Sequence, residues 1–197
     1  MLLFIEVLTL LFFLGFAAHA VVLRGAAGAA FFGAMLLLGF LRENFVVLRD
    51  ILYGFAPLRL MLGRAPLIAS IIWGYSIYAA VVWAEAVSGE RYGARRPSAR
   101  FLALVSLFMI ALACFYEPFL ALIGMARWQA GTRSVLGVPL ITWIGYPSLA
   151  VLFLLLWGWA MEKNSSAKRA IALLIPLPFL AVGHALGLQA IKDGLGL

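Results

Sequence analysis

Hydrophobic residues gather in six long runs along the chain, and short polar segments separate them. The runs cover residues 2–23, 26–48, 66–87, 101–124, 138–160 and 170–191. A helix needs about 20 mostly apolar residues to cross the hydrocarbon core of a bilayer, and each run reaches that length. The pattern therefore predicts one bundle of about six transmembrane helices that takes up the whole chain, with no internal repeat and with both termini on the same side.

The polar segments between the runs are of two kinds. Residues 24–25, 88–100 and 162–169 are short or plainly polar, and their order places them on one surface of the bundle, here named face B. The opposite surface, face A, carries residues 49–65 and 125–137, which mix arginines with aromatic and aliphatic residues. Such mixtures are typical of segments that lie in the membrane interface. We expect an all-α integral membrane fold with two interfacial or re-entrant segments packed on face A.

Composition separates this chain from soluble proteins, because 65% of its 197 residues are hydrophobic and 12% are charged. Soluble domains average about 45–50% apolar and about 25% charged residues. The 15 basic residues outnumber the 8 acidic ones. In a membrane protein this excess suits anionic lipid headgroups, so we expect the bilayer and not nucleic acid as partner. The single cysteine, Cys114, excludes an internal disulfide framework and a cysteine-ligated metal cluster.

Polar side chains on four of the expected helices reach a similar depth in the membrane. From the rise per residue of a helix, Glu43 lies roughly 25 Å from face B, Glu117 roughly 24 Å and His184 roughly 21 Å. Tyr75 reaches the same layer from the side of face A. Three further polar side chains can join it: Asn44, Thr142 and Tyr146. The sequence therefore predicts a polar layer inside the half of the bundle next to face A.

The two carboxyls of this layer have a functional and a structural interpretation. An ionisable residue inside a membrane costs about 2.5–3.5 kcal/mol on insertion scales and usually faces the bundle interior. Structurally, Glu43 could pair with Arg42 or Arg49 near the interface, and Glu117 could bond to a neighbouring helix. Pro118 favours the functional interpretation of Glu117, because a proline kinks the helix and lets the carboxyl line a cavity.

Aromatic residues allow a similar pair of interpretations. Tyr75 and Tyr78 share one face of their helix with Glu85. A tyrosine at mid-membrane depth needs a hydrogen-bond partner, so this face is predicted to look onto the polar layer, although ordinary helix packing explains it equally well. Trp73 is either a residue of the aromatic belt at the membrane interface or a lipid-facing packing residue, and the second is the commoner case.

Several cofactor chemistries do not fit these residues. The three lysines lie at the edges of the expected spans, which excludes a retinal Schiff base. His19 and His184 differ by roughly 13 Å in depth, too much for two axial haem ligands. A di-metal carboxylate site needs more acids and histidines than the layer offers. Nucleotide-binding and hydrolase motifs are missing from the sequence. We expect neither a metal nor a cofactor.

Two blocks of the sequence resemble the membrane carotenoid biosynthesis proteins, which include the bisanhydrobacterioruberin hydratases and related carotenoid 1,2-hydratases. The first block consists of Glu43-Asn44-Phe45, Tyr53-Gly54-Phe55, Ala65-Pro66-Leu67 and Trp73. The second consists of Glu117-Pro118, Trp128, Gly137-Val138-Pro139-Leu140 and Gly145-Tyr146. The resemblance rests on the order of these pieces across residues 43–147. The chain departs from the family pattern at four positions. The family has an aspartate where this chain has Glu117 and another acid where it has Ala113. It has an asparagine at the position of Thr142 and a tryptophan at that of Tyr146.

The resemblance implies a cofactor-free reaction on an isoprenoid or carotenoid substrate in a bacterial or archaeal cytoplasmic membrane. A carboxylic acid protonates a terminal double bond, and water or an internal alkene captures the cation. We expect Glu117 to be the acid, Glu43 to position water or take back the proton, and His184 to act as a relay; the two glutamates could exchange roles. The expected substrate contacts are Asn44, Tyr53, Trp73, Tyr75, Tyr78, Trp128, Thr142 and Tyr146.

Two other classes of protein stay open on the sequence alone. A non-catalytic membrane subunit could hold a carotenoid, quinone or lipid in the same layer, as part of a larger complex or a homo-oligomer. A small transporter or proton channel is less favoured, because no polar path is expected between the layer and face B.

Overall fold

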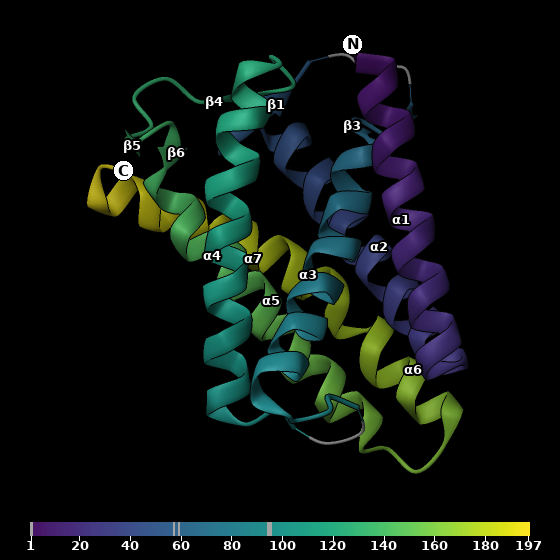
Figure 1. Cartoon of the computed structure of the whole chain (residues 1–197). Helices are drawn as coiled ribbons and strands as arrows, with labels where there is room; N and C mark the ends of the chain where they lie inside the picture. Colours follow the sequence, from purple (N-terminus) through teal and green to yellow (C-terminus); the bar gives the residue numbers. More distant parts are fainter. Residues whose placement is uncertain (1, 57, 59, 94–95) are drawn as a thin grey trace.

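The computed structural model describes residues 2–56, 58, 60–93 and 96–197, and it is a bundle of apolar helices (Figure 1). Its helices are α1 (Leu2–Arg24), α2 (Ala26–Arg49), α3 (Leu67–Ser88), α4 (Ala99–Leu122), α5 (Leu140–Met161), α6 (Ser166–Leu174) and α7 (Pro176–Leu195). In the described part of the chain, six helical stretches are long and apolar enough to cross a membrane, with α6 and α7 together forming the last. The prediction of an all-α integral membrane bundle is confirmed.

The last span is broken into two helices. The expected single run of 170–191 is divided where α6 ends at Leu174 and α7 begins at Pro176. Proline lacks a backbone N–H and fits the first turn of a helix, so it begins α7 at this point. Figure 1 shows α7 crossing the bundle obliquely, with its C-terminal end near β5 and β6.

The two segments expected on face A meet there as short strands. They contain β1 (Tyr53–Phe55), β2 (Met61–Leu62), β3 (Ala65–Pro66), β4 (Ala126–Trp128), β5 (Ser134–Val135) and β6 (Val138–Pro139). Strand β1 pairs antiparallel with β4, while β2 pairs with β3 and β5 with β6. Figure 1 shows β1, β3 and β4 at the end of the bundle that carries the N-terminus. The expected packing on one face is confirmed, and the pairing of strands satisfies backbone groups that an irregular segment would leave open.

An internal repeat organises the middle of the chain, and the expectation of no repeat is wrong. The order α2–β1–β2–β3–α3 is followed by α4–β4–β5–β6–α5. The lengths agree element by element: 24 residues in α2 and α4, 22 in α3 and α5, three in β1 and β4, and two in each remaining strand.

Each unit has a two-residue hairpin turn, although the two turns differ in detail. Gly63 has a φ of +72° at the first position of its turn, whereas Leu136 and Gly137 have φ angles of +53° and +78° at both positions of theirs; glycine adopts this conformation without a steric penalty. Pro66 and Pro139 then cap α3 and α5 with the same extended backbone. The two units run in the same direction through the bundle, as in parallel membrane repeats.

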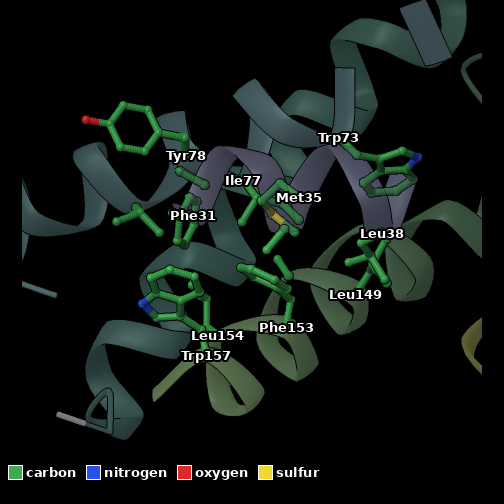
Figure 2. Packing of buried hydrophobic residues seen from close by; sticks show 14 of the residues in the cluster. Phe31, Met35, Leu38, Trp73, Ile77, Tyr78, Leu149, Phe153, Leu154 and Trp157 are labelled. Atoms are coloured by element: carbon green, nitrogen blue, oxygen red, sulfur yellow. The ribbon is translucent and has the colours of Figure 1, made fainter. Parts of the chain in front are cut away.

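Large side chains fill the half of the bundle toward face B. Figure 2 shows the contact between three helices: Phe31, Met35 and Leu38 of α2, Trp73, Ile77 and Tyr78 of α3, and Leu149, Phe153, Leu154 and Trp157 of α5. Helices α2 and α3 come very close at Gly39, where an added Cβ would lie 2.5 Å from the carbonyl oxygen of Ser70.

Candidate functional site

A pocket lies below the β1–β4 pair, where the two repeat units face each other. Its walls come from the ends of α2 and α4, the beginnings of α3 and α5, strands β1 and β4, and one residue of α7. It encloses about 620 Å³ of space between atoms, counting the part that is open to the outside. Most of the lining surface is apolar, and eight of the lining side chains carry polar atoms: Arg42, Glu43, Tyr53, Trp73, Glu117, Trp128, Thr142 and Tyr146.

Glu43 forms the first half of the site. Its side chain is 1% exposed and receives three donors. Arg42 donates through Nη1 at 2.5 Å, Trp73 through its indole nitrogen at 2.7 Å, and the Tyr53 hydroxyl at 2.9 Å to Oε2 and 3.0 Å to Oε1. Arg42 is itself 3% exposed, so this is a fully enclosed ion pair. Arg42 therefore supplies a compensating positive charge directly beside the Glu43 carboxyl.

Glu117 forms the second half with neutral donors. The indole nitrogen of Trp128 donates to Oε2 at 2.9 Å, and the hydroxyl of Tyr146 donates to Oε1 at 2.8 Å. Glu117 is 5% exposed. In the part of the chain that the structure describes, no salt bridge involves this carboxyl. The two glutamates therefore share a pocket, as the sequence predicted, but differ in charge compensation.

The two halves are built alike. Glu43 takes one donor from the following strand, 10 residues on, and one from the following helix, 30 residues on. Glu117 does the same at separations of 11 and 29 residues. The strand donors Tyr53 and Trp128 are register partners, with ring centroids 4.8 Å apart.

The helix donors of the two halves also meet. The ring centroids of Trp73 and Tyr146 are 4.9 Å apart. Figure 2 shows the indole nitrogen of Trp73 pointing away from the hydrophobic core, which is the direction its bond to Glu43 requires. The pocket thus joins two equivalent half-sites, one from each repeat unit.

Arg42 is the site residue that sequence reasoning did not select. The sequence indicated Arg42 only as a structural partner of Glu43 near the interface. In the structure the guanidinium reaches under the ring of Trp73, at 4.9 Å from its centroid, and donates to the Tyr53 hydroxyl at 2.5 Å. The arginine directly before Glu43 was the available signal.

His184 does not line the pocket. It contacts the side of Arg42 that faces away from the pocket. Arg42 Nε donates to His184 Nδ1 at 3.3 Å. Since an arginine nitrogen can only donate, Nδ1 is the acceptor and Nε2 carries the hydrogen. Nε2 lies 3.0 Å from Ser148 Oγ and 3.2 Å from the Gly145 carbonyl oxygen. The geometry fits a residue that positions Arg42 and not a relay in contact with the substrate.

The phenol of Tyr53 stays protonated at the top of the site. Burial raises its pKa well above the usual value; the charge of Arg42 lowers it and the charge of Glu43 raises it, each by less than burial does. A protonated phenol is the form that donates to a carboxylate. Tyr53 therefore acts as a fixed donor to Glu43.

Thr142 and Asn44 have structural partners. Thr142 lines the pocket, but its hydroxyl donates at 2.7 Å to the Pro139 carbonyl oxygen, one turn earlier. Asn44 does not line the pocket. Its amide donates to the carbonyl oxygens of Phe40 and Leu62, each at 2.9 Å, and its side-chain oxygen accepts from the backbone nitrogens of Arg64 and Ala65. The expected substrate contact at Asn44 is corrected to a brace that ties α2 to the β2–β3 hairpin.

Tyr75 and Tyr78 also lie outside the pocket, against α1. The ring of Tyr75 stacks on Phe16, and the Tyr78 hydroxyl lies 2.9 Å from His19 Nδ1. Tyr78 and Trp73 stand at opposite ends of the cluster in Figure 2. The expectation that these tyrosines face the polar layer is corrected. Trp73 has the inward position, and Tyr75, two residues further along the helix, is turned away from it by about 200°.

Among the described residues, no group of three or more His, Cys, Asp or Glu side chains is placed to hold a metal ion. What the pocket offers is one ion-paired carboxylate, one carboxyl held by neutral donors, and aromatic walls. Comparison of the chain with protein-family models, curated proteins and solved structures finds no match, so the chemistry of the site is argued from its own geometry.

Proposed function

We propose that this protein is a cofactor-independent membrane enzyme that protonates a terminal C=C bond of a carotenoid or other polyprenyl chain, followed by hydration or ring closure. The observation that carries the proposal is that two buried carboxyls share one apolar pocket, while among the described residues a salt bridge is made by Glu43 and not by Glu117. The resemblance of residues 43–147 to the carotenoid hydratases supports the choice of substrate and implies a bacterial or archaeal cytoplasmic membrane.

Glu117 takes the role of the acid. A buried carboxylate without a paired cation is costly, which favours the protonated form. The indole N–H of Trp128 can only donate, so Oε2 is the acceptor oxygen of the acid. Oε1 then carries the proton, and a lone pair of the same oxygen still accepts the hydrogen bond from the Tyr146 hydroxyl. This leaves a defined oxygen from which a proton can pass to an alkene.

Glu43 takes the role of the base. The bonds from Arg42 and Trp73 end on Oε1, whereas Oε2 receives Tyr53 alone. Oε2 therefore keeps a lone pair with which to orient water or remove a proton. Because Arg42 and Glu43 cancel, the site is neutral before reaction, and the carboxylate formed on Glu117 becomes the counter-ion of the carbocation.

The reaction balances with water as the single co-reactant. The π electrons of the double bond form a C–H bond with the Glu117 proton and leave a tertiary cation. In hydration, water bonds to that cation and loses a proton to Glu43. In ring closure, a second double bond attacks the cation and an adjacent carbon loses a proton to Glu43. Return of this proton to Glu117 completes the cycle, and the aromatic faces stabilise the cation meanwhile.

Product analysis tests the proposal directly. The full-length protein is produced in membranes that contain an acyclic carotene, and the extracted pigments are separated and weighed by mass spectrometry. A product heavier by one water shows hydration, and an isomer with a shorter chromophore shows ring closure. Unchanged carotene with a well-inserted protein contradicts the proposal.

A non-catalytic role is the second candidate, and the saturated hydrogen bonding of the site favours it. Arg42 and Trp73 bond to Glu43, and Trp128 and Tyr146 bond to Glu117, so each carboxyl joins elements of the bundle as carboxyls with a purely structural role do. In that case the purified protein retains a polyene, quinone or lipid that it does not convert. Recovery of bound, unaltered carotene would support this role in a membrane complex.

A further inference from the structure

A second cavity opens on the outside of the bundle between α5 and α7. It is a groove lined by Ile144, Ser148 and Leu152 of α5 and by Phe179, Gly183 and Gly187 of α7, among others, and it holds about 690 Å³ counting the space open to the outside. Phe179 and Leu152 are exposed on its rims, at the depth where the span α6–α7 faces lipid. The groove is thus an apolar channel on the membrane-facing surface.

One leucine separates this groove from the candidate site. Leu188 lines both cavities and is buried. It packs on Gly145, where an added Cβ would lie only 2.9 Å from Leu188 Cδ1. Gly145 also lines the central pocket. Leu188 is therefore a side chain on the boundary of the two spaces, and the wall that it faces at Gly145 has no side chain.

The groove is shaped and lined for hydrocarbon. Ideal Cβ atoms at Gly183 and Gly187 would have no neighbour within 4 Å, so these glycines leave open width along α7. The groove's polar atoms belong to Ser148 and His184, which bond to each other. Because these two side chains are hydrogen-bonded to each other, a ligand in the groove needs no polar group to satisfy them.

The central pocket is too small for the whole of a long chain. It encloses about 620 Å³ of space between atoms, and this figure already includes the part that is open to the outside. The rest of a polyprenyl chain must leave the pocket, and the route should share a wall with it. Another membrane-facing groove, along α1 from Leu8 to His19, shares no lining residue with the pocket.

Building on the proposed function, we infer that the α5–α7 groove is the membrane-side entrance of the pocket, that it holds the trailing part of the substrate chain, and that Leu188 is its gate. The occupant is a single linear isoprenoid chain. It enters from the bilayer with its reacting end first and passes Gly145 to reach Glu117.

Photolabelling of the full-length protein in phospholipid nanodiscs tests this inference without relying on turnover. The probe is geranylgeraniol with a diazirine at its hydrocarbon end, and labelled peptides are mapped by mass spectrometry. The wild type should be labelled chiefly in the pocket, where the leading end comes to rest, with weaker label along the groove through which that end passes. Gly187→Trp places an indole ring in the open space of the groove. It should lower pocket labelling by about tenfold, the equivalent of about 1.4 kcal/mol. Gly15→Trp is the matched control in the α1 groove, and it should leave pocket labelling unchanged.

Leu188→Ala tests the gate separately. It should raise the rate of pocket labelling, because the partition is removed. The inference is overturned if Gly187→Trp and Gly15→Trp have equal effects, if the pocket is labelled normally with the groove filled, or if label spreads evenly over all lipid-facing helices as annular lipid would. Failure of the proposed function looks different: the groove and pocket are labelled as expected, but no substrate is converted by the wild type.

Discussion

Tyr53 and Trp128 stand opposite each other in the β1–β4 pair, and each donates a hydrogen bond to the glutamate of the preceding helix. Two equivalent positions of a repeat thus hold two carboxyls over one pocket. What separates the two halves is the residue before each glutamate: Arg42 in the first unit and Tyr116 in the second. Arg42 contacts Glu43, whereas the ring of Tyr116 lies against Tyr75. A symmetric scaffold therefore carries an asymmetric pair of acids.

Replacing Glu117 by glutamine should abolish most of the activity. The variant keeps the side-chain volume and can still accept from Trp128, but it has no proton to give, so turnover should fall at least about 10²-fold. The neutral amide is no costlier to bury than the protonated acid, so folding should survive. Rates of product formation in membranes measure the effect. Glu43→Gln is the comparison: it should lose less if Glu43 only orients water, and near-normal product from both variants would end the acid–base mechanism.

Removing one member of the Arg42–Glu43 ion pair should destabilise the folded protein more than removing both members. Arg42→Met leaves Glu43 buried without its cation, and removal of one member of a buried pair costs about 3–5 kcal/mol. The double variant Arg42→Met, Glu43→Leu removes both charges and should recover much of this loss. Thermal unfolding of the purified protein in one detergent measures both. A double variant that is less stable than either single variant would contradict a pair whose main energetic term is mutual compensation.

Tyr53 should make stability depend on alkaline pH. Its folded-state pKa is raised above the usual value near 10, so the folded protein keeps a proton that the unfolded chain loses. This stabilisation is complete below about pH 10 and is lost as the pH rises through the folded-state pKa. Unfolding temperatures at a series of pH values should therefore fall more steeply above about pH 10 in the wild type than in Tyr53→Phe. Parallel curves would show that the phenol is not protected by burial.

Asn44→Ala should loosen face A without altering the chemistry. The substitution removes four hydrogen bonds to the backbone and leaves some of these groups unpaired, at a cost of about 1–3 kcal/mol for each buried one. Faster amide hydrogen exchange over residues 61–66 is the expected readout. The identity of the product should stay the same, and a changed product would return Asn44 to the substrate pocket.

The linear sequence by itself determined the membrane fold and the depth of its polar groups. Each apolar run is a local property, and the requirement to satisfy backbone bonds in lipid leaves the helix as its only structure. Depth follows from the fixed rise per residue, which placed Glu43 and Glu117 in one layer before any contact was known. The proline at the α6–α7 junction was also visible, although its effect on the last span was not taken into account.

Tertiary structure alone decided which side chains meet. The rotation of each helix about its axis turned Trp73 and Arg42 inward, and it turned Tyr75 and Tyr78 toward α1. These helices have apolar residues on every side, so no periodic pattern in the sequence reveals that rotation. Pairing of β1 with β4 depends on contacts between segments more than 70 residues apart, as Gln129 and Asp50 also show with a separation of 79. The repeat stayed hidden because packing conserves lengths, turns and a few anchoring residues, while most lipid-facing positions accept any apolar side chain.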